Sequence, residues 1–187
     1  IYHEEDETFG TSVWKTKSDE YIIISSYSTM AEEYRFLSAN NPMGEFKIIQ
    51  PRERGLEYSI SHFGDYFYIK TNLDAQNFRL MRTSVKNTTK ENWEEVIPHR
   101  EDVFLQDMEL FKKYLVLEER RGGLSQIRII NWTDNSEHYL DFGEETYMAY
   151  ISTNPNFESE YLRYGYTSLT TPNSTIDYNM STKEKIV

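Results

Sequence analysis

Short segments along this chain alternate apolar and polar residues, and the segments recur with a period. A tyrosine opens one segment in each repeat, at Tyr21, Tyr66, Tyr114 and Tyr161, so the intervals are 45, 48 and 47 residues. These segments are rich in β-branched and aromatic residues, which favour strands. A repeat of this length predicts a fold built from stacked copies of one unit.

Three further strand-like segments accompany each tyrosine segment. Those before the tyrosines are 11–14, 57–60, 103–106 and 147–151; those after are 33–37, 77–81, 126–130 and 175–179; the closing segments are 46–49, 93–97, 138–142 and 185–187. In the third segments Tyr34, Phe78, Ile127 and Ile176 are taken as anchors, because each is followed by a charged and then an apolar residue. Four antiparallel strands per unit, repeated four times at about 47 residues, predict an all-β fold of four-stranded β-propeller blades.

The predicted blades span about 1–51, 52–98, 99–143 and 144–187. Residues 101–113 resemble a helix at first sight, but the repeat assigns them to a strand. Because the chain opens on a first strand and stops on a last strand, we expect four whole blades cut from a larger ring. A closed four-bladed propeller is the alternative.

The charge balance limits the choice of partners. The chain has 20 Lys and Arg against 31 Asp and Glu, a net charge of −11. This argues against nucleic acid and against an anionic membrane surface as the main partner. A cationic ligand, or solubility alone, fits the balance. The chain has no cysteine and no apolar run of the roughly 20 residues that a membrane helix needs.

Catalytic and metal-binding motifs are missing from the sequence. No serine lies in a Gly-x-Ser-x-Gly elbow, and the nearest approach, residues 122–125, is interpreted as a hairpin turn at Gly122-Gly123. The four histidines, His3, His62, His99 and His138, are not at metal-ligand spacing. The sequence therefore predicts no catalytic, metal-binding or cofactor-binding residue.

Two charged features remain. Glu118-Glu119-Arg120-Arg121 ends a predicted strand, and alternation places Glu118 and Arg120 on one face and Glu119 and Arg121 on the other. These residues are either solvated at a turn or form ion pairs at a rim that faces another domain. Arg163 lies in an otherwise apolar strand. A buried arginine needs a carboxylate, and Glu118 or Glu119 of the preceding blade is the expected partner.

The motifs as a whole are similar to a known family. Residues 2–9 (YHEEDETF), 57–59 (EYS), 117–124 (LEERRGGL) and 162–172 (LRYGYTSLTTP) resemble the oligopeptidase B (protease II) branch of the prolyl oligopeptidase family. The last motif is the most distinctive. The resemblance runs over essentially the whole chain.

This resemblance implies a seven-bladed propeller that caps an α/β-hydrolase domain. It implies a serine peptidase that cuts short peptides after Lys or Arg and is located in the cytoplasm. A location in the periplasm stays an alternative. The catalytic residues of the family lie in the hydrolase domain, C-terminal to the matched region, and none maps onto this chain. The implied partners are that hydrolase domain and basic peptides. The fragment alone is expected to be an inactive segment that gates the access of substrate. The candidate residues for structural or interdomain ion pairs are Glu118, Glu119, Arg120, Arg121 and Arg163.

Two other classes of function stay open. A protein-interaction propeller of the WD type usually closes its blades with Trp-Asp, whereas Trp14, Trp93 and Trp132 precede Lys, Glu and Thr. A propeller enzyme with a channel site would need converging carboxylates or histidines on its first strands. The available residues are Glu57, His62, Asp102 and Asp107.

Overall fold

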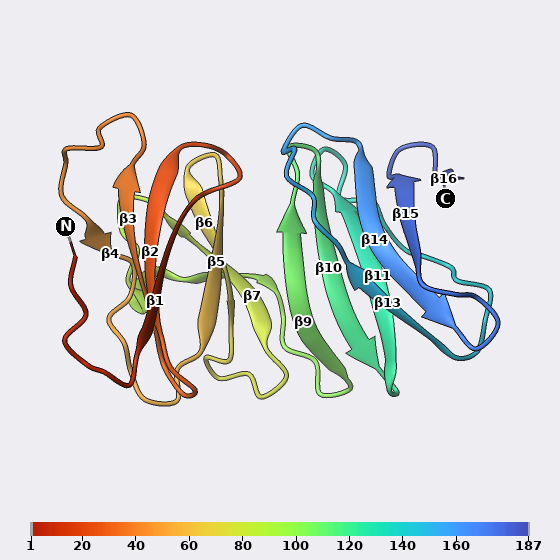
Figure 1. The fold of residues 1–187 in the computed structure, drawn as a ribbon, viewed down its shortest axis with the longest axis horizontal. Helices are drawn as coiled ribbons and strands as arrows, with labels where there is room; N and C mark the ends of the chain where they lie inside the picture. The colour runs from red at the N-terminus through yellow and green to blue at the C-terminus, as the bar shows by residue number, and fades with distance from the viewer. Residues whose placement is uncertain (1, 187) are drawn as a thin grey trace. The chain divides into compact units, whose positions relative to one another are not determined.

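The computed structural model describes residues 2–186, and its strands form four antiparallel four-stranded sheets that follow one another along the chain (Figure 1). Within each sheet, every strand is hydrogen-bonded to its neighbour in sequence. The chain divides into two compact units, Ile1–His99 and Arg100–Val187, with two sheets in each. The predicted all-β architecture of propeller blades is confirmed.

The first unit holds two sheets. The strands of the first sheet are β1 (Gly10–Lys15), β2 (Tyr21–Tyr27), β3 (Glu32–Ser38) and β4 (Lys47–Ile48). Those of the second are β5 (Tyr58–Phe63), β6 (Tyr66–Thr71), β7 (Arg79–Ser84) and β8 (Glu94–Ile97), with a 3₁₀ turn η1 (Lys90–Asn92) before β8. The outer strands β4 and β8 are short, which leaves few unpaired backbone groups at those edges.

Aromatic and β-branched side chains fill the space between β1–β4 and β5–β8. Ile23 and Phe36 of the first sheet belong to one buried cluster with Phe67 and Ile69 of the second. The rings of Phe36 and Phe67 meet edge to face, with centroids 5.0 Å apart. Backbone groups also join the sheets, since a Glu32 carboxylate oxygen accepts the N–H of Tyr58 at 2.7 Å.

The second unit repeats this plan. Its first sheet consists of β9 (Val103–Leu110), β10 (Tyr114–Arg121), β11 (Leu124–Asn131) and β12 (Glu137–Tyr139). Its second sheet consists of β13 (Tyr147–Ile151), β14 (Tyr161–Ser168), β15 (Ser174–Asn179) and β16 (Lys185–Ile186). The four period tyrosines are therefore the first residues of β2, β6, β10 and β14.

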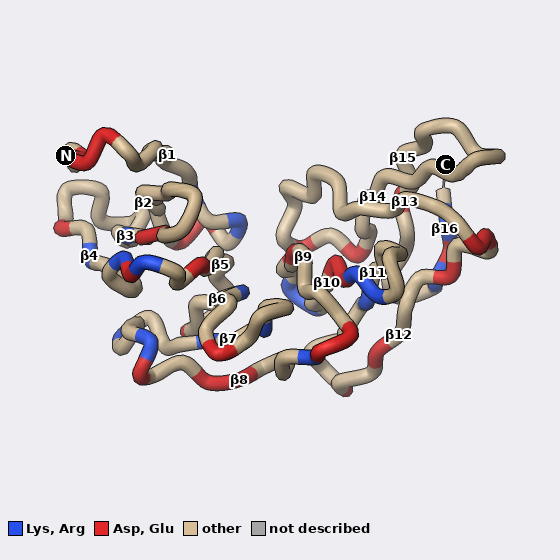
Figure 2. The backbone as a smooth tube through the Cα atoms, turned by 90° about the horizontal axis from the view of Figure 1, so that it is seen from below, with Lys and Arg blue, Asp and Glu red and all other residues tan. Residues whose placement is uncertain are grey.

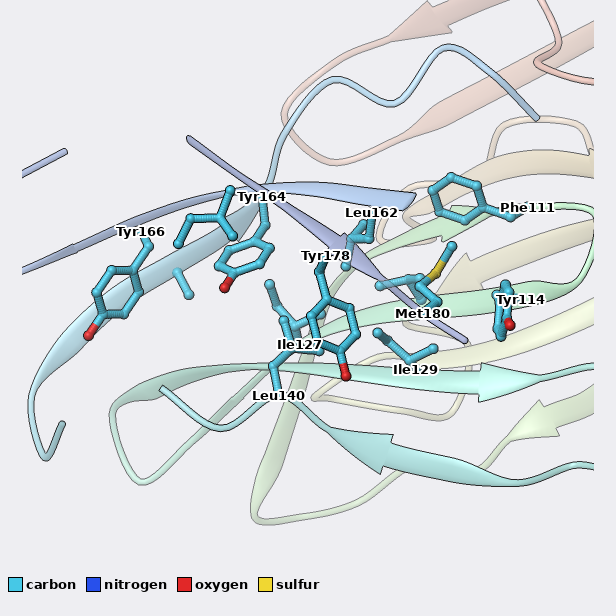
Figure 3. Packing of buried hydrophobic residues seen from close by; sticks show 13 residues of the cluster. Phe111, Tyr114, Ile127, Ile129, Leu140, Leu162, Tyr164, Tyr166, Tyr178 and Met180 are labelled. Carbon is cyan, nitrogen blue, oxygen red and sulfur yellow. The ribbon is translucent and has the colours of Figure 1, made fainter. Parts of the chain in front are cut away.

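The core of the second unit lies between its two sheets. Val116, Ile127 and Ile129 come from β10 and β11, and Tyr164 and Tyr178 come from β14 and β15. Figure 3 shows Tyr178 directed toward Ile127 and Ile129 across the two sheets. Successive side chains of a strand point to opposite faces, and these residues of β10, β11, β14 and β15 lie on the faces that meet.

The structure confirms two details of the sequence interpretation. Residues 103–110 within the helix-like stretch 101–113 form strand β9. Gly122 and Gly123 join β10 to β11 with φ of 57° and 85°. This left-handed pair is the geometry that a two-residue hairpin needs, and glycine adopts it at little cost.

Two of the third-strand anchors are placed differently. Phe78 lies just before β7 with φ of 61°, and Leu80 instead occupies the position opposite Lys70 that Tyr34 occupies opposite Ser25. The connection between β6 and β7 is longer than the one between β2 and β3, so the equivalent position falls on Leu80 rather than Phe78. Ile176 lies within β15, but it is one residue beyond the equivalent position and so points to the opposite face.

Within residues 2–186, the structure contains no helix that is long and apolar enough to cross a membrane.

Candidate functional site

The charged motif of β10 is built around a β-bulge. Glu118 pairs with Asp107 of β9 and Glu119 pairs with Leu105, so Gln106 is the extra residue. A bulge re-aims side chains on its strand. The Gln106 side chain uses this freedom to donate to Glu118 at 3.3 Å and to accept from Arg120 Nε at 3.0 Å. Glu118 and Arg120 thus share one partner, as expected for one face of a strand.

Glu118 connects the two sheets of the second unit. Its side chain is buried, and Oε2 accepts the backbone N–H of Ile151 on β13 at 2.8 Å. A second tie lies nearby, where Ser125 Oγ accepts the N–H of Ala149 at 2.9 Å. A buried carboxylate that accepts a backbone N–H is a charge-assisted bond, so Glu118 holds the first strand of the next blade in place.

Glu119 is the centre of an ion-pair network. Its side chain is 0% exposed and contacts Arg100, which lies just before β9. Tyr139 of β12 donates its hydroxyl to Oε2 at 2.9 Å, and Arg128 Nη1 of β11 lies 3.6 Å from Oε1. Arg128 also pairs with Glu137. Glu118 and Glu119 are therefore not simply solvated at a turn, which is one of the two interpretations of this motif.

The two arginines of the motif differ from the glutamates. Arg120 is exposed apart from its bond to Gln106. Arg121 pairs with Asp102 at 2.7 Å, and both side chains are 60% exposed. Such exposed pairs contribute little to stability. The arginine side chains are thus available at the surface, whereas the glutamates serve the fold.

The prediction that Arg163 pairs with Glu118 or Glu119 is wrong. Arg163 Nε and Nη2 bind the two oxygens of Asp177 at 2.7 Å each, and its side chain is 52% exposed. The register places Asp177 directly opposite Arg163 on β15. Arg163 also points away from the face that carries Leu162 and Tyr164, which pack toward Glu118 and its sheet. The Arg163 guanidinium lowers the pKa of Asp177.

Glu144, which no sequence motif singled out, organises the most distinctive motif. The hydroxyls of Tyr166, Thr170 and Thr171 donate to its carboxylate at 2.8, 2.9 and 3.1 Å. The Ser168 hydroxyl and these three hydroxyls lower the pKa of Glu144 to about 2, and Ser168 makes the largest contribution. Glu144 thereby ties the loop before β13 to the β14–β15 turn. Hydroxyl groups at alternating positions after an acidic loop were the available signal.

The N-terminal motif also has a partner that the sequence did not reveal. Arg52 Nη2 lies 2.7 Å from Glu4 Oε2, and its guanidinium lies 4.0 Å from the centre of the Phe9 ring. Arg35 lies 4.1 Å over the Tyr2 ring. The hydrogen bond from Arg52 is the main cause of the lowered pKa of Glu4. The motif thus fastens residues 2–9 to the first sheet through two arginines.

The residues considered for a channel site do not converge within the described chain. Glu57 accepts from Asn72, Asp102 pairs with Arg121, and Asp107 accepts the N–H of the adjacent Met108. His62 is buried, with Nδ1 2.8 Å from Ser18 Oγ. Among residues 2–186, no group of three or more His, Cys, Asp or Glu side chains is arranged to hold a metal ion.

The family model of the prolyl oligopeptidase N-terminal β-propeller domain matches residues 1–187. The chain belongs to this family. Dipeptidyl aminopeptidase BI of Pseudoxanthomonas mexicana is 38% identical over 99% of this chain and 25% of its own length. Protease 2 of Moraxella lacunata is 27% identical over 99% of this chain and 26% of its own length.

Solved structures agree with this assignment. The closed form of oligopeptidase B from Trypanosoma brucei, with covalently bound antipain, has a TM-score of 0.89 and 28% identity, covering 99% of this chain and 28% of that one. Oligopeptidase B from Leishmania major has a TM-score of 0.89 at 24% identity, with the same coverages, and shows the fold. The resemblance to the oligopeptidase B branch is confirmed. The chain spans about a quarter of the length of the relatives it matches.

Proposed function

We propose that residues 1–187 are a non-catalytic part of the propeller of a serine peptidase, and that this propeller restricts the enzyme to short peptides cut after Lys or Arg. The observation that carries the proposal is the match of the whole chain to the propeller domain, together with the TM-score of 0.89 to oligopeptidase B. The predicted blade boundaries and the seven-bladed ring belong to this proposal.

The reacting groups are assigned to a hydrolase domain outside this chain. The 187 residues contain no cysteine and no Gly-x-Ser-x-Gly elbow. The Trypanosoma brucei structure holds antipain covalently, and a covalent adduct is expected where an enzyme supplies a nucleophile. That structure is more than three times as long as the segment matched here, since the match covers 28% of it.

The packing of the sheets supports the proposed restriction to short peptides. In each unit the space between two sheets is filled by buried aromatic and β-branched side chains. A cover assembled from such sheets is stiff and leaves no room for a folded protein to pass between blades. Short flexible peptides can use openings that folded proteins cannot.

The charge supports basic substrates. The net charge is −11, and acidic positions are spread over both units rather than collected on one element (Figure 2). Negative potential raises the local concentration and association rate of cationic peptides, and salt screens it. An association rate that stays unchanged from low to high salt would contradict this part of the proposal.

A second activity is favoured by one relative. Dipeptidyl aminopeptidase BI is 38% identical to this chain, and its name describes release of dipeptides rather than cleavage after a basic residue. The protein-interaction scaffold has less support, because the family match covers the entire chain.

The test uses the full-length protein with reporter peptides of matched length. The proposal expects rapid cleavage after Lys or Arg, loss of cleavage with a serine-directed inhibitor, and no turnover by residues 1–187 alone. Blocking the peptide N-terminus separates the two activities: an enzyme that releases dipeptides loses its activity, whereas one that cuts after a basic residue keeps it. Inhibitor-sensitive turnover by residues 1–187 alone would refute the non-catalytic assignment.

A further inference from the structure

A small cavity lies at the two turns of the second unit that join β11 to β12 and β15 to β16. Its volume is about 250 Å³, below the roughly 300–1,000 Å³ of pockets for drug-sized ligands. The buried side chains of Ile129 and Met180 line it (Figure 3), and Ser181, Lys183 and His138 add polar groups. The hairpin cavity, as we call this space, therefore has the size for a small polar ligand.

The two turns that border the hairpin cavity have the same construction. Asn131 begins one and Asn179 begins the other, and each side-chain oxygen accepts the N–H of the residue two positions later, at 2.8 and 2.9 Å. The N–H of Asn135 donates to the Asn131 carbonyl at 2.9 Å. In the same way, the N–H of Lys183 donates to the Asn179 carbonyl at 2.8 Å. Asn135 and Lys183 thus occupy equivalent positions.

Lysine is an unusual residue for this position. The φ angle is 56° at Asn135 and 65° at Lys183, which is the left-handed region. Asparagine enters that region several-fold more readily than most other residues. Strained backbone at other residues is concentrated at functional sites. Because Asn135 meets the needs of the fold in the first turn, the lysine side chain is expected to serve another purpose at the hairpin cavity.

Lys183 brings an unneutralised positive charge to the hairpin cavity. Within residues 2–186, its ammonium group forms no ion pair with a carboxylate. The imidazole of His138 lies nearby, and its Nε2 is 2.8 Å from the Tyr178 hydroxyl of β15. Burial lowers the pKa of His138, and the charge of Lys183 lowers it further. Two nitrogen-bearing side chains are therefore collected from the two sheets.

Two carboxylates also line the hairpin cavity, but each has a partner. Asp134 Oδ1 accepts the N–H and the hydroxyl of Ser136 at 2.9 and 2.7 Å. Glu137 forms an ion pair with Arg128. Lys183 is therefore the charged group of the lining that still lacks a partner among the described residues, and a negatively charged ligand would supply one.

We propose that the hairpin cavity binds a small oxyanion, a carboxylate or a phosphate, between Lys183 and His138. Lys183 supplies the charge, and a hydrogen bond between an ammonium group and an oxyanion is stronger than one between neutral groups. The Ser181 hydroxyl and the His138 imidazole can each donate a further hydrogen bond. Because these groups come from both sheets, the bound oxyanion fastens β12 to the β15–β16 turn. The proposal does not depend on peptide specificity.

Lysine labelling in the full-length protein measures occupancy of the hairpin cavity. Inorganic phosphate and acetate are the two probes, each compared with chloride at equal ionic strength, and acetylation of individual lysines by an activated ester is followed by mass spectrometry. An ammonium group held by an oxyanion is protected, so an oxyanion at twice its Kd should slow acetylation of Lys183 about threefold. Protection by phosphate or by acetate identifies which oxyanion binds.

Lys86 is the internal control, because it is exposed in the turn after β7 and lies in the first unit. Its acetylation should be the same in phosphate, acetate and chloride. Equal slowing of Lys86 and Lys183 would show non-specific association of anions with lysine, and no slowing of Lys183 by either probe would show no binding. Either result would overturn the proposal.

Lys183→Asn is the matched variant, because it copies Asn135 and keeps a residue that tolerates the left-handed turn. Its readout is hydrogen exchange of the β12 amides in the full-length protein. The oxyanion that protects Lys183 should slow this exchange about threefold in the parent and leave it unchanged in the variant, because ligand must leave before the strands separate. Lys183→Arg keeps the charge and should keep the effect. An equal effect in Lys183→Asn and the parent would refute the role of Lys183.

Discussion

Removal of the Glu119 carboxylate is the sharpest test of how the β10 motif works. In the Glu119→Ala variant, Arg100, Arg128 and the Tyr139 hydroxyl lose their common partner. Removing one partner of a buried pair costs about 3–5 kcal/mol. The Arg100 side chain is 29% exposed and Arg128 keeps Glu137, so the groups left behind are partly compensated. We therefore expect a loss of about 3 kcal/mol, at the lower end of that range.

Arg121→Ala is the matched control, two residues further along the same strand. It breaks a pair with Asp102 in which both side chains are 60% exposed, so a change of about 0.5 kcal/mol or less is expected. Hydrogen exchange of the β10, β11 and β12 amides in the full-length protein reports the opening free energy of this sheet without requiring that the whole protein unfold in one step.

Equal opening free energies in the two variants would show that Glu119 does not hold the sheet through a buried network. A loss in Glu119→Ala that is confined to the amides around Arg100 would show the same, because a network that joins β10, β11 and β12 must loosen all three strands. A loss of protection in β10 and β11 alone would likewise show that Tyr139 is not held through Glu119.

Three further variants test other parts of the structure. Gly165→Ala should destabilise the β13–β14 pair by about 1 kcal/mol, because its Cβ displaces the Tyr150 ring, and Tyr150→Ala added to it should recover most of the loss in urea unfolding. Burial lowers the pKa of His62 below 6.5, so the unfolded chain binds the proton first and the stability of the first unit should fall as the pH drops below 6.5; His62→Asn should remove that slope. The Ser168 and neighbouring hydroxyls lower the pKa of Glu144 from 4.5 to about 2, so its contribution should be present above pH 4.5 and lost as the pH falls toward 2, and Glu144→Gln should show no such dependence.

The blades could be predicted from the sequence because their signals are local. Alternation of apolar and polar residues sets which side chains of a strand face a neighbouring sheet, and Tyr21, Tyr66, Tyr114 and Tyr161 each open a strand that contributes to a core. The Gly122-Gly123 turn was predictable for the same reason, since φ above zero at two successive positions requires such residues.

The ion pairs could not be predicted, because their partners depend on register and on loops. Arg163 reaches Asp177 only because β14 and β15 pair in one register, and a shift of one residue in the assumed anchor Ile176 hides this. One of the partners of Glu119 is Arg100, which lies outside the strands described above. Glu144 lies in a loop whose position depends on the folded hairpin that it binds.

We propose that this chain is part of a propeller that admits short peptides to the enzyme and excludes folded proteins. The most direct measurement is kcat/KM of the full-length enzyme for one Arg-containing sequence, presented first as a short peptide and then within an exposed loop of a stably folded carrier protein. We expect kcat/KM to be at least about 100-fold higher for the peptide than for the folded carrier, and cleavage to recover when the carrier is unfolded. Equal values for the peptide and the folded carrier would contradict it.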